Sequence, residues 1–479
     1  MKERQRKMIA ENSVGFLRRL RKSLSLDRVT NLLLLPVMIA LLSRVSFFSL
    51  PDNKFTFFIG AIVFWYILVE GSFESNHFFR LHRSYRYTVF MIVSIGVFVN
   101  SFISVVVPSE FSLVITPIFL GTATVTILVG YEVGIATGLF MAYLSAFSIG
   151  TIESFVIFST IALISTLTTR NILRRINIAR AGFETGIIFA LILFARSFFE
   201  VKLSLLQLVI SFFNPVFSAI IVIGILPYIE YASRIYSNIG LLELGNLSHP
   251  LLKSLSLSAP GTYQHSVSIA NLAEIAAEEI GANPILARVA AYFHDIGKSK
   301  RPQYFTENQR GLNPHESLSP SMSNLVINEH VKLGVELAKK YRLPILVEDV
   351  IREHHGTRIK KYFYHKAKTS GEDNPDSFRY PGPKPRFKES GIIMLADSVE
   401  AAFKSLKDPT PGKIQELVEE VVNGIYNERQ LDKSGLNLED LEKIIEAFTR
   451  VLISMSQARI EYPKEKVEKV VRINENNHK

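Results

Sequence analysis

The chain has 479 residues, of which 48% are hydrophobic, and its 54 Lys and Arg exceed its 44 Asp and Glu by a formal charge of +10. Its mean hydropathy is +0.21, which is too apolar for a soluble chain of this length divided into ordinary globular domains. It contains no cysteine, which excludes disulfide scaffolds, cysteine zinc sites, iron–sulfur clusters and thiol nucleophiles. Any metal site must therefore use histidine and carboxylate ligands.

The apolar residues are concentrated in the first half of the chain. We predict a basic N-terminal arm over 1–28, a helical membrane domain over 29–230 and a cytoplasmic domain over 231–479. A bilayer core about 30 Å thick needs about 20 apolar residues per helix. Eight stretches fit this requirement, or seven without a short or Ser/Thr-rich one: 31–50, 55–69, 87–107, 113–129, 131–149, 152–168, 183–199 and 205–228.

The basic residues predict the orientation of these spans. Lys and Arg gather in the N-terminal arm and in the loops after the second and sixth spans, while the alternate loops almost lack them. With eight spans, all basic loops lie on one side, so we expect a cell-membrane protein with both termini in the cytoplasm. We attribute the basicity to this topology and to attraction by anionic lipid, not to a nucleic-acid polymer. Charged residues lie mostly at span ends, which argues against a transporter.

The second half has the pattern of an all-α domain. Amphipathic segments follow one another after residue 229, and strand-like alternation is nearly absent. Asn283 before Pro284 is a typical helix start, and we expect this helix to end at Gly297. Other helices are predicted over 262–280, 323–341, 346–355, 388–405, 413–426 and 438–455. The stretch 369–385 is turn-rich, and loops of this length are usually functional or disordered.

Histidines are the main indication of chemistry, because nine of the eleven follow residue 245. Two pairs, His294-Asp295 and His354-His355, close predicted helices. Imidazole and carboxylate are the ligands that Mn, Fe and Zn favour where thiolate is missing. Adjacent residues on a helix diverge by about 100°, so one pair can address two sides of one metal or two different metals.

These residues lead to a family resemblance. His265, His294-Asp295 and Asp397 follow the H…HD…D order of the HD-domain phosphohydrolases, and His330 with His354-His355 resembles their two-metal subset. The strings APGTYQHS, ARVAAYFHDIGK, RPQYFTENQ, EHHGT and FRYPGPKP are similar to the membrane-anchored seven-transmembrane HD proteins, the PgpH-type cyclic di-AMP phosphodiesterases. One feature departs from that family. Only residues 49–54 separate the first two spans, so its usual large extracytoplasmic domain is expected to be absent.

The resemblance implies a role for each matched residue. It implies a site for two divalent ions, most simply Mn²⁺ or Fe²⁺, bridged by the catalytic Asp295. The implied ligands are His265, His294, Asp295 and Asp397 for one ion, and His330, His354 and His355 with Asp295 for the other. Lys298 is a candidate for stabilising phosphate charge, although a lysine favoured by the helix dipole is an equally good interpretation. Arg379 and Tyr380 are weaker candidates for substrate contact.

Two ions about 3.5–4 Å apart can activate a bridging water for in-line attack on phosphorus. The residues alone therefore indicate metal-assisted phosphoester hydrolysis, and the resemblance implies hydrolysis of cyclic di-AMP to pApA. The alternatives are an HD hydrolase for another nucleotide and a membrane receptor that binds nucleotide without turnover. The sequence after His355 lacks the Gly-Tyr-Pro motif of cyclic di-GMP enzymes, and the complete ligand set disfavours a receptor. Whether the protein is a homodimer is left open.

Overall fold

A computed structural model describes residues 60–457, except 62, 76, 200–202, 310, 312, 370 and 372–373. The predicted arm, the first span and the 49–54 loop lie outside the described residues, and the second span lies partly outside them. Two compact units are distinguished. The first contains the residues up to His249 and the segment Glu336–Glu348, and the second contains Pro250–Val335 and the chain from Asp349 onward. The all-α prediction is confirmed, because the only extended pairing among the described residues is an isolated bridge between Ile359 and Arg379.

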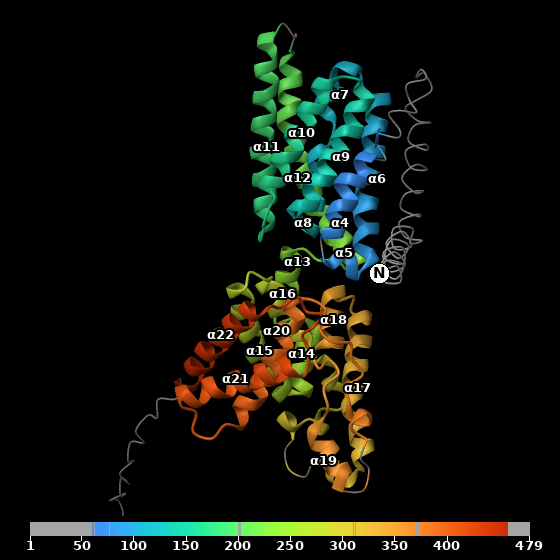
Figure 1. Ribbon diagram of the computed structural model, residues 1–479. Helices are drawn as coiled ribbons and strands as arrows, with labels where there is room; N and C mark the ends of the chain where they lie inside the picture. The colour runs from blue at the N-terminus through green and yellow to red at the C-terminus, as the bar shows by residue number, and fades with distance from the viewer. Residues whose placement is uncertain are drawn as a thin grey trace, which may run out of the picture. The chain divides into compact units, whose positions relative to one another are not determined.

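The first unit is a bundle of apolar helices that run roughly along one direction (Figure 1). Its elements are η1 (Tyr66–Glu70), α4 (Gly71–Ser75), α5 (His77–Leu81), α6 (Arg83–Val106), α7 (Ser109–Ile115), α8 (Ile118–Val129), α9 (Tyr131–Ile149), α10 (Ile152–Thr168), α11 (Arg175–Arg196), η2 (Ser197–Phe199), α12 (Leu205–Ser233) and α13 (Asn238–Leu244). By length and composition, three described helices can cross a membrane: Glu110–Val129, Arg175–Phe199 and Leu205–Ser233. Phe98, Phe102 and Ile220 are 53%, 55% and 56% exposed, as expected where a bundle faces lipid.

One predicted span differs from the structure. The sequence predicts a continuous helix over 113–129, but α7 ends at Ile115 and α8 begins at Ile118, because Pro117 cannot continue a helical hydrogen-bond ladder. The Asn214 amide donates to the carbonyls of Val114 and Thr116 at 2.7 and 3.1 Å, which satisfies acceptors that the break exposes. Polar side chains within this unit thus serve the backbone, as irregular structure in a membrane requires.

The charged groups near the span ends form ion pairs between helices. The guanidinium of Arg196 forms a two-pronged contact with the Glu153 carboxylate, with Nη2 and Oε2 2.9 Å apart. Arg86 and Glu70 lie 3.3 Å apart. At the end of α12, Arg234 donates to the Leu343 carbonyl and to the Glu348 carboxylate, each at 2.8 Å. These last contacts explain why Glu336–Glu348 groups with the first unit.

The second unit is an α-helical domain around α15 (Pro260–Glu279) and α20 (Lys388–Ser405). Helix α15 packs against α20 and against α14 (Pro250–Ser258), α16 (Pro284–Phe293) and α22 (Leu438–Gln457). The remaining elements are η3 (Ile296–Lys300), η4 (Pro302–Tyr304), η5 (Thr306–Asn308), η6 (Pro314–Ser317), α17 (Pro320–Lys340), α18 (Ile345–Glu353), α19 (Lys361–Thr369), η7 (Pro375–Phe378) and α21 (Pro411–Asn427). Buried aliphatic side chains such as Ile269, Leu272, Ile392 and Leu395 hold α15 to α20.

Candidate metal centre

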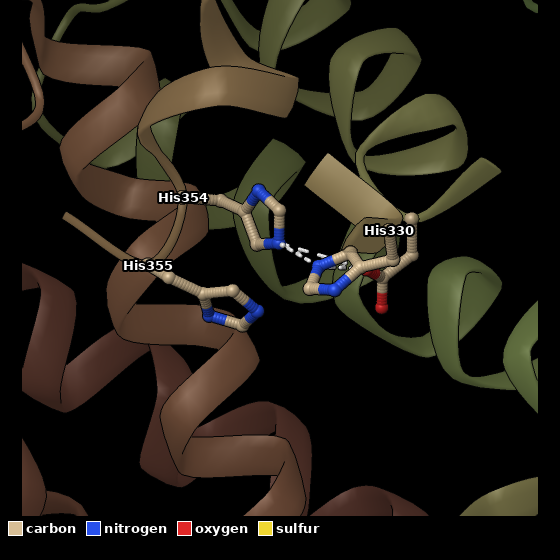
Figure 2. Close-up of side chains that lie close together, drawn as sticks. His330, His354 and His355 are labelled. Atoms are coloured by element: carbon tan, nitrogen blue, oxygen red, sulfur yellow. Dashed lines mark hydrogen bonds and ion pairs between the residues drawn. The ribbon is translucent and has the colours of Figure 1, made fainter. Parts of the chain in front are cut away.

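The seven predicted ligands lie together in the second unit. Their donor atoms form two groups, within each of which all atoms lie within 4.8 Å of one another. One group is His265, His294 and Asp397, and the other is Asp295, His330, His354 and His355. Figure 2 shows the ring of His354 directed at that of His330, with His355 beside them. The Nε2 atoms of His330 and His354 are 3.5 Å apart.

The helices end early to present the two pairs. The sequence predicts a helix reaching Gly297, but α16 ends at Phe293, and His294-Asp295 lies in the turn before the 3₁₀ segment η3. Likewise α18 ends at Glu353, so His354 and His355 follow it. Gly297 explains the first difference. A Cβ atom there would lie 1.9 Å from the carbonyl oxygen of His330, so only glycine lets this turn pack directly on α17.

We therefore expect Gly297→Ala to lower the free energy of unfolding by about 1–3 kcal/mol and to weaken metal binding, because η3 and His330 must separate. Thermal unfolding with and without Mn²⁺ measures both effects. Gly424→Ala is the matched control, because a Cβ atom there meets nothing within 4 Å and alanine favours its helix α21. A Gly297→Ala protein as stable as the control, with unchanged metal affinity, would contradict this account.

Three of the histidines are oriented by the backbone of their own helical turn. The Nδ1 atoms of His294, His330 and His354 hydrogen-bond the carbonyls of Ala291, Ile327 and Ile351 at 2.7, 2.5 and 2.9 Å. A carbonyl can only accept, so each ring carries its proton on Nδ1. Each Nε2 lone pair then faces Asp295, at 3.2, 3.4 and 3.5 Å from its carboxylate oxygens.

The protonation states of Asp295, His330 and His355 suit a cation. Burial opposes ionisation of Asp295, but the ammonium of Lys298 holds the pKa of its carboxyl well below the usual range. Burial lowers the pKa of His330 to about 3 and that of His355 well below its ordinary value. Neutral imidazoles and ionised carboxylates are the forms that bind metal.

Two central polar atoms also lack hydrogen-bond partners. Among the described residues, neither Oδ1 of Asp295 nor Nε2 of His294 has a hydrogen bond, whereas Oδ2 of Asp295 pairs with the Lys298 ammonium at 2.7 Å. Buried acceptors without donors are costly, so their convergence favours a ligand. The nitrogen and oxygen donor set fits divalent Mn, Fe or Zn.

Two known protein families match parts of this chain. The HD domain family matches residues 262–402, and the family described as 7TM receptor with intracellular HD hydrolase matches residues 54–237. Between them, the two families match parts of both halves of the chain. The predicted resemblance is confirmed, and the chain is a membrane protein.

Relatives of the family agree over both parts of the chain. Cyclic-di-AMP phosphodiesterase PgpH of Bacillus subtilis (strain 168) is 43% identical over 271 residues, which are 56% of this chain and 38% of that protein. The protein of the same name from Listeria monocytogenes is 38% identical over 312 residues, 63% of this chain and 43% of that one. The chain thus spans about two fifths of the length of these relatives.

More distant relatives and solved structures were also found. Ribonuclease Y of Streptococcus sanguinis (strain SK36) is 30% identical over 190 residues, 38% of this chain and 31% of that protein. The crystal structure of the L. monocytogenes PgpH HD domain is 42% identical, with a TM-score of 0.42, and covers 44% of this chain and 100% of that one. Its complex with cyclic-di-AMP has a TM-score of 0.43 at the same identity, over 44% of this chain and 99% of that one.

The predicted substrate-contact residues differ in how close they lie to the metal ligands. The Lys298 Nζ atom is 2.7 Å from a carboxylate oxygen of Asp295. The ring of Tyr380 stacks on His355, with centroids 4.1 Å apart and planes 26° apart. Arg379 instead pairs with Asp376 at 2.7 Å and donates to the Thr357 carbonyl at 3.2 Å. Lys298 and Tyr380 therefore border the ligands, whereas Arg379 contacts Asp376 and Thr357 instead.

One residue of this site was missed by sequence reasoning. The buried Glu400 bonds Nδ1 of His265 at 2.7 Å, while Nε2 of that ring lies 3.1 Å from Asp397. Burial opposes protonation of His265, but these two carboxylates raise its pKa to about 9, so this ring must release a proton when it binds a metal. A carboxylate behind a ligating imidazole is the usual arrangement for fixing its tautomer. The available signal was the spacing, because Glu400 follows Asp397 by three residues on the same face of α20.

We expect Glu400→Gln to weaken Mn²⁺ binding by about 10–100-fold, because the amide can still bond the ring but removes the negative charge behind it. Calorimetric titration of metal-free protein with Mn²⁺ measures the affinity. Glu439→Gln is the control, since that carboxylate is exposed and pairs with Lys443 on the surface. Equal affinity for the two variants would remove Glu400 from the site.

Proposed function

We propose that this protein is a metal-dependent phosphodiesterase that hydrolyses cyclic di-AMP to pApA. The observation that supports this best is the gathering of seven histidine and aspartate ligands in two groups around Asp295. The names of its PgpH relatives support the substrate. A complete ligand set favours turnover over a receptor that only binds its nucleotide.

The two groups divide the Asp295 carboxylate between them. His294 approaches its Oδ2 atom at 3.2 Å, while His330 and His354 approach Oδ1 at 3.4 and 3.5 Å. His265, His294 and Asp397 with Asp295 would hold one ion, and His330, His354 and His355 with Asp295 would hold the other. When bound, two such divalent ions, Mn²⁺ or Fe²⁺, supply Lewis acidity that activates water and neutralises phosphate charge.

Lys298 and Tyr380 are our candidates for substrate contact. Burial disfavours the charged form of Lys298, but Asp295 and Glu307 raise the pKa of its ammonium above the ordinary value. The group therefore carries a positive charge beside the ligands, where it can stabilise charge on the phosphate. Tyr380 is partly exposed next to His355, and the Lys360 Nζ atom lies 3.8 Å from the centroid of its ring. We retain Arg379 only as an outer contact, given its bond to Asp376.

The decisive experiment uses the full chain in detergent. We expect purified protein with Mn²⁺ to convert cyclic di-AMP to pApA at pH 7, to lose this activity with a chelator and to regain it with added Mn²⁺. Binding of cyclic di-AMP without product would favour the receptor instead. Release of a different product from another nucleotide would favour another HD hydrolase.

The topology stays a prediction with its own test. We propose the arm over 1–28, the membrane domain over 29–230 and the HD domain over 231–479, with both termini in the cytoplasm. Phosphatase and fluorescent reporters joined after Lys479 and before Met1 should both report the cytoplasm, because the basic loops define the inner side. A C-terminal reporter active outside the membrane would overturn the eight-span arrangement.

A further inference from the structure

A second carboxylate, the half-buried Glu307, also contacts Lys298. The Oε1 atom of Glu307 accepts from Nζ of Lys298 at 2.9 Å and from the hydroxyl of Thr262, also at 2.9 Å. Nζ also lies 4.9 Å from the centroid of the Phe305 ring. The ammonium is thus shared between the carboxylates of Asp295 and Glu307.

The segment with Glu307 is fixed to the start of α15. The side-chain oxygen of Asn308 accepts from the backbone N–H groups of Gly261 and Thr262 at 2.9 and 3.2 Å, and its amide donates to the Thr262 hydroxyl at 2.8 Å. It thereby caps a helix whose own N-cap residue, Ala259, offers no side-chain acceptor. A Cβ atom on Gly261 would lie 1.9 Å from the Glu307 carbonyl oxygen, so the two backbones touch.

This arrangement has an electrostatic consequence for Lys298. An ammonium beside two divalent ions is repelled by them, and in a buried site little water screens that repulsion. The negative charge of Glu307, bonded to the ammonium, offsets the repulsion and holds the ammonium in place. Burial raises the pKa of Glu307, but Lys298 outweighs it and lowers that pKa, so the carboxylate is ionised.

We infer that Glu307 is a positioning residue for Lys298. The Asn308 cap on α15 holds the segment that carries Glu307, and Lys298 acts on the phosphate only while Glu307 is bonded to it. This inference rests on the proposed function, and nothing in the comparisons assigns Glu307. It gives the string TENQ a role: the glutamate holds the lysine and the asparagine holds the segment.

A double-mutant cycle tests it on the full chain loaded with Mn²⁺. The variants are Lys298→Met, Glu307→Gln and the double substitution, and the readouts are kcat/KM for cyclic di-AMP, the Kd for inorganic phosphate and the Mn²⁺ content. We expect each single variant to lower kcat/KM by about 30–100-fold and to weaken phosphate binding by about tenfold. The double variant should be no worse than Lys298→Met within about threefold. Mn²⁺ content should stay at the wild-type value.

Two further variants separate positioning from folding. Asn308→Ala removes the cap and should lower Tm, while its effect on phosphate affinity should be smaller than that of Glu307→Gln, because Glu307 keeps its own bonds to Lys298 and Thr262, and should disappear in the Lys298→Met background. Glu307→Asp keeps the charge on a shorter side chain and should recover part of the activity lost in Glu307→Gln. Additive losses in the Lys298–Glu307 cycle, or wild-type kinetics for Glu307→Gln, would overturn the inference. If the wild type does not cleave cyclic di-AMP, the proposed function fails. The Kd values for inorganic phosphate in the Lys298–Glu307 cycle still test whether Glu307 positions Lys298.

Discussion

Asp295→Ala is expected to abolish phosphodiesterase activity, with a loss of at least about a thousandfold in kcat, and to release most of the bound metal. The reason is geometric and electrostatic. The two oxygens of this one carboxylate face three imidazole nitrogens from three different segments. Without it, two cations lose a shared negative charge and their remaining ligands lose their common centre.

Asp295→Asn refines the test, because the amide keeps the shape but not the charge. We expect it to retain the fold by circular dichroism and Tm, to bind less metal and to remain inactive. His365→Ala is the control, since this exposed histidine of α19 lies outside both ligand groups. Turnover is followed as pApA release, and metal as Mn²⁺ per chain. An Asp295→Ala protein with wild-type turnover and full metal content would force us to abandon the binuclear assignment.

The ligand set could be predicted because each member sits in a locally readable pattern. His294-Asp295 and His354-His355 are pairs at predicted helix ends, and His265, His330 and Asp397 complete a spacing typical of one family. The structure brings all seven into two groups. The all-α fold followed from helix periodicity and caps such as Asn283, whose side chain accepts from the N–H groups of Ile285 and Leu286.

The supporting carboxylates could not be predicted in the same way. Glu400 lies 135 residues from His265, and Glu307 is 45 residues from Thr262. A glutamate on an amphipathic segment is ordinarily solvated, and only tertiary packing buries Glu400 and half-buries Glu307. The same limit explains the helix ends. Helical periodicity continues past Phe293, and it is the close approach of Gly297 to α17 that makes the chain turn there.

The preference for adenine is the second large effect that we expect. For the full chain with Mn²⁺, kcat/KM for cyclic di-AMP should exceed that for cyclic di-GMP by at least about tenfold. The metal site is proposed to act on the phosphate groups, which both cyclic dinucleotides share. The bases must therefore be distinguished by hydrogen bonds in the surrounding pocket. A mismatched polar edge left without a partner costs a few kcal/mol, and each 1.4 kcal/mol corresponds to about a factor of ten.

The same kcat/KM measurement also tests an RNA substrate and shows whether the membrane domain is needed for activity. The similarity to ribonuclease Y makes a short single-stranded RNA the informative competitor, and we expect it to be cleaved more slowly than cyclic di-AMP. All seven ligands lie between His265 and Asp397, so the fragment 240–479 should keep both the activity and the preference. Equal or reversed kcat/KM values for the two cyclic dinucleotides would remove the cyclic di-AMP assignment and leave metal-dependent phosphodiesterase chemistry standing. A fragment that is inactive beside an active full chain would instead show that the membrane spans are needed to assemble the site.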